Sequence, residues 1–255
     1  MRAEPAAKGD SAIVSPMSSG VIKNSKMKYI EYNREERDLC AHLFRLLLED
    51  QPNWRPLKDF LGITDIENPR IFCEVALFRD AYFARKPDVG DFIEGVCREI
   101  ARQNGISDFT KFHQLPDQIV NPEKTHPRQI RYKLKKMKRE ISHNDRVVYG
   151  SLQGMFNAKP DILICYNNQL IIYEAKYTLN FAEEQLNRTK QIGEIWAKLL
   201  YKDLDFSSVP VLQTKTIGLE KFRPDTSWEE IYNIARNYWR EDDFSLKVLS
   251  KVTRS

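Results

Sequence analysis

No stretch of apolar residues in this chain reaches the ~18 needed to span a bilayer, and its N-terminal residues contain no apolar core typical of a secretory signal. Paired CxxC cysteines and internal repeats are absent as well, and the four histidines lack the spacing of metal ligands. We therefore expect a protein of the cytosol, or of the nucleus if the source is eukaryotic, with no membrane partner.

The cysteines are few and none is placed for a short-range pair. The sequence predicts that they are free thiols in a reducing compartment rather than disulfide partners. The four are Cys40, Cys73, Cys97 and Cys165.

Charge is nearly balanced, with 40 Lys and Arg against 36 Asp and Glu, so the net charge is only +4. This balance permits a nucleic-acid partner without requiring one. The cations cluster, however, because residues 128–139 hold seven of them and no acid. We expect a helix here, in which Arg131, Lys135 and Lys136 either follow a nucleic-acid backbone or form an ordinary solvated face.

The first half of the chain shows helical patterns after a polar start. Residues 1–26 lack periodicity, which predicts a disordered tail, and residues 27–126 form a predicted helical N-terminal region. Its apolar spacing predicts helices at residues 31–50, 70–85 and 89–103, the last one ending near Gly105. Residues 106–126 are predicted to be mostly loop.

Strand patterns dominate residues 127–255, the predicted core region. Strands are expected at residues 146–152, 162–166, 170–177 and 209–217. A helix capped by Asn180 and Glu183 is expected before the last strand, and a closing helix at residues 226–240. This order predicts an α/β fold with a central mixed β-sheet flanked by helices.

The most informative segment is a predicted hairpin with its turn at Asn167 and Asn168, residue types that tolerate positive φ. If Tyr166 faces Gln169, then Asp161 lies directly across from Glu174 on one face. Directly opposed residues have Cβ atoms roughly 4.5–5.5 Å apart. Lys176, two residues beyond Glu174, shares that face.

Two opposed carboxylates are unfavourable unless a cation joins them, and a hard ion such as Mg²⁺ prefers carboxylate oxygens. In the simpler interpretation, Asp161 only starts a strand, and Glu174 and Lys176 form a cross-strand ionic cluster. A register slip of one residue would put the two acids on opposite faces and remove the argument for a metal.

Pro160-Asp161 followed by Glu174-Ala175-Lys176 resembles the PD-(D/E)xK motif of the restriction-endonuclease-like nuclease superfamily. The resemblance covers about 75 residues plus a preceding helix, and it implies an αβββαβ core. It also implies that Asp161 and Glu174 bind Mg²⁺, with Mn²⁺ as a possible substitute. Lys176 would then orient or help to deprotonate the attacking water.

The same resemblance suggests further residues. An acid from an earlier helix often lies near the metal, and Glu94 is the first candidate, ahead of Glu36 and Glu74; an ordinary helix residue is the alternative for each. A glutamine in the helix after the motif often points into the cleft, which suggests Gln185. Arg188 either contacts a phosphate or forms a surface ion pair.

The leading hypothesis is a metal-dependent nuclease that hydrolyses phosphodiester bonds in DNA, an endonuclease rather than an exonuclease, and a possible homodimer. The alternative is a catalytically inactive protein of the same fold that binds nucleic acid or acts as a scaffold. A third interpretation is an unrelated α/β protein with an accidental motif.

Overall fold

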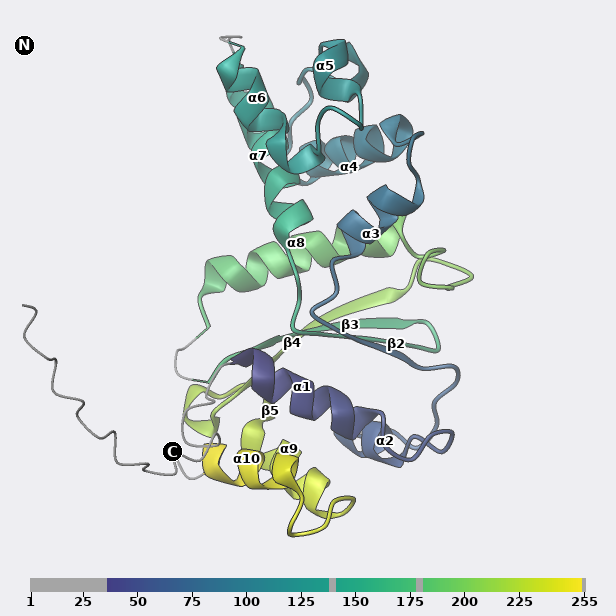
Figure 1. Cartoon of the computed structure of the whole chain (residues 1–255), viewed down its shortest axis with the longest axis vertical. Helices are drawn as coiled ribbons and strands as arrows, with labels where there is room; N and C mark the ends of the chain where they lie inside the picture. Colours follow the sequence, from purple (N-terminus) through teal and green to yellow (C-terminus); the bar gives the residue numbers. More distant parts are fainter. Residues whose placement is uncertain (1–35, 138–140, 178–180, 254–255) are drawn as a thin grey trace, which may run out of the picture.

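The computed structural model describes residues 36–137, 141–177 and 181–253, and it places a five-stranded sheet between two groups of helices (Figure 1). The tail predicted for residues 1–26 lies outside the described residues. The sheet and its two helical layers confirm the predicted α/β class.

The sheet is mixed, as predicted. Its order is β1-β2-β3-β4-β5, with antiparallel pairing from β1 to β3 and parallel pairing from β3 to β5. The strands are β1 (Arg70–Cys73), β2 (Ile162–Tyr166), β3 (Gln169–Ala175), β4 (Val211–Gly218) and β5 (Thr226–Ser227).

The central hairpin strands are apolar on both faces because both faces are covered. Leu163 and Ile172 lie in one buried cluster, and Ile164 and Ile171 lie in a second cluster on the other side. The sheet therefore separates two hydrophobic cores.

Four helices cover the face of Ile164. On α1, which confirms a helix within the predicted residues 31–50, an apolar stripe is fully buried: Leu39, Leu43, Leu46 and Leu47. The four are α1 (Glu36–Leu47), α2 (Arg55–Leu61), α9 (Trp228–Arg236) and α10 (Phe244–Val252).

The face of Leu163 is covered by α8 (Glu183–Leu199), with a further group of helices packed above it (Figure 1). At Gly193, α8 lies so close to the sheet that an added Cβ would be 2.8 Å from Ile172 Cδ1. The overlying elements are α3 (Leu77–Ala84), α4 (Gly90–Gln103), α5 (Asp117–Val120), α6 (Ile130–Lys136) and α7 (His143–Asn157). Short 3₁₀ turns complete the order, at Phe112–Gln114, Pro127–Gln129 and Glu220–Phe222.

The helix predicted for residues 70–85 is wrong in its first half. Ile71 pairs with Ile164 in the sheet, so the chain is extended there as β1. Glu74 follows with a φ of 51°, a left-handed conformation that separates the strand from α3. The helices predicted at 89–103 and after Pro127 are confirmed as α4 and α6, and Gly105 has the positive φ expected beyond a helix end.

The strand predicted at residues 146–152 is wrong, because α7 occupies this part of the chain. Ser142 and Asp145 form a reciprocal capping box that starts the helix. Its buried residues Val148, Tyr149 and Leu152 then recur at helical spacing.

Two helix boundaries also differ from prediction. Glu183 is the first residue of α8, preceded by Ala182, so it is not the third residue of a capping box; Asn180 lies outside the described residues. The closing helix begins at Trp228 after a short strand, and α10 was not predicted.

The two predicted regions, 27–126 and 127–255, share one sheet, because β1 pairs along its whole length with β2. Both buried clusters draw residues from each region. Within the ranges the structure describes, no helix is long and apolar enough to cross a membrane.

Candidate active site

The hairpin has the predicted register. Tyr166 pairs with Gln169 and Ile162 pairs with Tyr173, and Asn167 in the turn has a φ of 47°. Extending this register by one residue puts Asp161 opposite Glu174. The predicted hairpin register is confirmed, and its extension by one residue puts both acids on the same face of the sheet.

Asp161 is held at the start of β2 through its side chain and its backbone. Its Oδ2 accepts a hydrogen bond of 2.8 Å from the backbone N–H of Ala175. Its carbonyl oxygen accepts one of 3.1 Å from the N–H of Glu74, just beyond β1. Burial, and to a smaller degree the Glu174 charge, raise the pKa of Asp161 to about 6, although the Ala175 hydrogen bond opposes this.

Glu174 is fixed by two side chains one turn apart on α8. Thr189 Oγ1 donates to its Oε1 at 2.8 Å, and Gln185 Nε2 donates to its Oε2 at 3.1 Å. Burial raises the pKa of Glu174, and these two hydrogen bonds oppose that rise because they favour the charged carboxylate. Gln185 therefore points toward the predicted site.

Lys176 is held by contacts of both its side chain and its backbone. Its Nζ lies 3.1 Å from Oε2 of Glu36, at the start of α1. Its backbone N–H donates to the carbonyl of Ile217 on β4 at 2.7 Å, and its carbonyl accepts from the Trp228 indole at 3.0 Å. The side chain is mostly buried, so this ammonium group has a defined position.

Glu36 completes the charged cluster, which we define as Glu36, Asp161, Glu174 and Lys176. Besides pairing with Lys176, its Oε1 accepts the backbone N–H of Tyr177 at 3.2 Å. Its charge also contributes to the raised pKa values of Asp161 and Glu174. Across the described ranges, no group of three or more His, Cys, Asp or Glu side chains has the spacing of a metal site. The candidate metal donors are therefore two carboxylates, Asp161 and Glu174.

The structure does not bring Glu94 to this cluster. Glu94 is only 4% exposed, and its Oε2 accepts a hydrogen bond of 2.6 Å from the N–H of Phe112 and lies 3.6 Å from His113 Nδ1. These contacts belong to the helical layer above α8. Glu74, the other alternative, forms an ion pair with Arg37.

A cavity of about 400 Å³ opens beside Glu174, between the end of α7 and the first turns of α8. Arg188 and Lys159 are the cations that line it. The other predicted nucleic-acid contacts lie on α6, where Arg131, Lys135 and Lys136 are exposed. The cavity is lined by Ala158, Lys159, Pro160, Glu174, Ala182, Glu184, Gln185, Arg188, Thr189 and Ile192.

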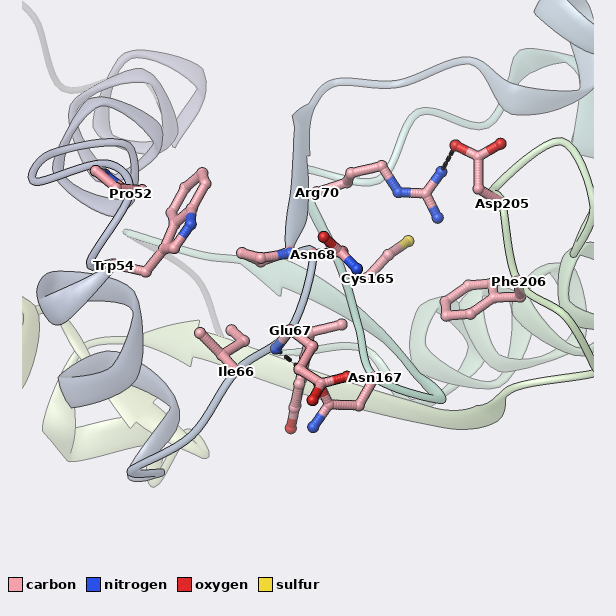
Figure 2. Close-up of a pocket in the computed structure, with 12 residues that line it drawn as sticks. Pro52, Trp54, Ile66, Glu67, Asn68, Arg70, Cys165, Asn167, Asp205 and Phe206 are labelled. Carbon is pink, nitrogen blue, oxygen red and sulfur yellow. Dashed lines mark hydrogen bonds and ion pairs between the residues drawn. The ribbon is translucent and has the colours of Figure 1, made fainter.

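A larger cavity, of about 900 Å³, lies at the other end of the hairpin, around the Asn167 turn (Figure 2). Two of its charged residues pair with each other, since Arg70 forms an ion pair with Asp205 and also lies over the Phe206 ring. The Asn167 side chain accepts the backbone N–H of Glu67 at 2.9 Å. These contacts stabilise the loops around the cavity and place no acidic pair there.

Two residues of the site were missed or ranked low in the sequence. Thr189 was not among the predicted site residues, although its spacing from Gln185 puts both on one face of the helix. Glu36 was ranked behind Glu94, because only the packing of α1 against the sheet brings it to Lys176. Comparison with protein-family models, with curated proteins and with solved structures finds no match to this chain.

Proposed function

We propose that this protein is a metal-dependent nuclease that hydrolyses phosphodiester bonds, with DNA as the default substrate and endonucleolytic cleavage as the expected mode. The observation that carries the proposal is the opposed pair Asp161 and Glu174 with Lys176 beside it. The pair follows directly from the hairpin register.

The donor set suits Mg²⁺ or Mn²⁺. Asp161 and Glu174 both have raised pKa values, so the fold disfavours two bare negative charges at this position. A divalent cation between the carboxylates would offset that cost, and oxygen donors are the ligands it prefers. When bound, such an ion supplies Lewis-acid polarisation of the phosphate and activation of water.

The chain's own residues have separate tasks. Gln185 and Thr189 hold the Glu174 carboxylate in place and favour its charged form. Glu36 holds the Lys176 ammonium in place, where it can donate hydrogen bonds to the attacking water or to a phosphate oxygen that gains charge.

The order of elements supports the resemblance to the restriction-endonuclease-like superfamily. Reading α1, β1, β2, β3, α8 and β4 along the chain gives αβββαβ, with α2 between α1 and β1 and residues 74–161 inserted between the first two strands. In this comparison, β1 would take the place of the first core strand, which the sequence had predicted at residues 146–152.

One observation favours the alternative, a nucleic-acid-binding protein without turnover. Both oxygens of Glu174 accept protein hydrogen bonds, and Lys176 is paired with Glu36, so these groups already have partners. An inactive relative would keep such contacts for structural reasons alone.

The test is incubation with supercoiled, linear and single-stranded DNA and with RNA, in Mg²⁺, Mn²⁺ or EDTA. We expect metal-dependent cleavage, lowered about 10²–10³-fold in Asp161→Asn and Lys176→Ala. Lys190→Ala, an exposed lysine on α8, is the matched control and should cleave normally.

Cleavage that persists in both site variants would refute the assignment of these residues. Retained DNA binding with no cleavage under any condition would select the non-catalytic alternative.

A further inference from the structure

A third cavity, of about 490 Å³, lies between α7 and α8 and shares Glu184 and Arg188 with the cavity beside Glu174. The two cavities therefore lie side by side, with Glu174 lining one of them, and we refer to them together as the α7–α8 groove. The third cavity is lined by Gly150, Ser151, Gly154 and Met155 from α7 and by Glu184, Asn187, Arg188 and Gln191 from α8.

The α7 wall is open along one side of the helix. Gly150, Gly154 and Ala158 are four residues apart, so they lie above one another on the same face. A Cβ added at Gly154 would meet nothing within 4 Å. The groove therefore has room for a ligand at this position.

Two cationic side chains line the groove, and two more lie close to its α7 wall. Arg188 lines both cavities, and Lys159 lines the one at Glu174. Arg131 Nη1 lies 3.5 Å from the Cβ position of Gly150, so the basic helix α6 directs a guanidinium onto α7. Arg128 donates to Asn157 Oδ1 at 3.4 Å, near the other end of the same helix.

We propose that the α7–α8 groove binds one strand of a polynucleotide and guides it to Glu174, an inference that rests on the proposed nuclease function. Arg131, Arg188 and Lys159 contact successive phosphates. The cavity volumes fit a nucleotide-sized ligand. Tyr132, next to Arg131 and 65% exposed, offers a ring on which a base stacks, as is typical of single-strand binding.

Glu184 lines both cavities, and its negative charge disfavours a phosphate ligand there. We expect Glu184→Gln to tighten the binding of a single strand by removing this repulsion. The sign of this effect separates a phosphate-binding groove from one that binds a cationic partner.

The first experiment measures fluorescence anisotropy of labelled single-stranded DNA of about 15 nucleotides, in EDTA so that no cleavage occurs. Single-stranded RNA and duplex DNA of the same sequence are the other probes. Single strands should bind more tightly than the duplex. Arg131→Gln and Arg188→Gln should each reduce the slope of log K against log salt by about 0.7. Arg240→Gln, at a remote exposed arginine, is the control and should leave the slope unchanged.

The second experiment fills the groove. Gly154→Leu adds a side chain where there is space, and it should weaken single-strand binding by about tenfold or more. Gly95→Leu on α4 is the matched control, because that glycine is also helical and half-buried, and a Cβ added there would meet nothing within 4 Å. It should bind as the unmodified protein does.

Equal binding by Gly154→Leu and the unmodified protein would overturn the proposal, as would absence of single-strand binding or preference for duplex. Hydrolysis of bis(p-nitrophenyl) phosphate with Mn²⁺ distinguishes the two proposals, since this small substrate needs the charged cluster but not the groove. Single-strand binding that Gly154→Leu weakens, without hydrolysis of the small substrate, would support the proposed groove and reject the nuclease function. Hydrolysis of the small substrate, together with single-strand binding that Gly154→Leu leaves unchanged, would support the nuclease and reject the groove.

Discussion

Asp161 is a carboxyl group placed where its charged form is disfavoured, and this leads to a pH dependence of stability. The folded protein raises its pKa from 3.8 to about 6, so between these values the folded state holds a proton that the unfolded state has lost. Its contribution to the free energy of unfolding therefore falls as pH rises from about 4 to about 6, by up to about 3 kcal/mol, and is constant above.

Asp161→Asn should remove this contribution, because asparagine keeps the oxygen that accepts the Ala175 hydrogen bond but carries no charge. We expect metal-free Asp161→Asn to be more stable than the unmodified protein at pH about 7, and similar to it at pH about 4. Urea unfolding in EDTA across this range measures the difference. Parallel stability curves for the two proteins would contradict the raised pKa.

Gln185 and Thr189 act on the site through Glu174, so they are positioning residues. Thr189→Val and Gln185→Leu each remove a hydrogen bond that favours the charged carboxylate, and each should lower Mg²⁺ affinity about 10–100-fold. The pH–rate profile should also move to higher pH, since the pKa of Glu174 rises further. Thr214→Val on β4 is the matched control, and a purely structural role would leave the profile in place.

At the scale of elements, Gly193 sets how closely α8 approaches the sheet. A Cβ there would be 2.8 Å from Ile172 Cδ1 and 2.9 Å from Leu212 Cδ1. Gly193→Ala should therefore destabilise the protein by about 1–2 kcal/mol, despite the better helix propensity of alanine.

Gly154→Ala is the matched control, because it adds the same methyl group to a helix with no neighbour within 4 Å of the new Cβ. It should stabilise by about 0.4–1 kcal/mol. Denaturant unfolding of both variants measures the comparison, and equal shifts of the same sign would contradict the close packing of α8.

Local patterns in the sequence were sufficient for some elements and misleading for others. The hairpin was predictable because turn chemistry at Asn167 and the apolar alternation fix the register together. Residues 70–85 were misassigned because Ile71, Val75, Phe78 and Tyr82 happen to continue one helical stripe. Only pairing with β2, contributed from far along the chain, makes Ile71 part of a strand. Where tertiary pairing determines the conformation of a short segment, the periodicity of its sequence alone does not predict it.

The candidate site also has residues that could be predicted from the sequence and residues that could not. Asp161, Glu174 and Lys176 are close in sequence, so hairpin geometry was enough to place them together. Glu36 comes from α1, and its contact with Lys176 depends on how that helix packs on the sheet. Glu94 had an equally plausible helical setting, yet its helix lies in the layer above α8.

At the scale of the whole molecule, the N-terminal and C-terminal regions depend on each other. A fragment of residues 127–255 lacks β1, α1 and α4, and exposes apolar surface on both faces of the sheet. We expect it to show no cooperative thermal unfolding by circular dichroism, in contrast to the full chain. A sharp transition in the fragment would show that the region is an independent domain.

The segment inserted between β1 and β2 begins and ends at neighbouring positions beside the sheet. There the N–H of Glu74 donates to the carbonyl of Asp161 at 3.1 Å, so the two ends of the insertion are joined at a residue of the charged cluster. A displacement of the inserted helices relative to the sheet would therefore move Asp161 relative to Glu174. A nucleic-acid strand bound between α7 and α8 would in this way change the distance between Asp161 and Glu174. Binding of the substrate would then also bring the two acids into their final positions.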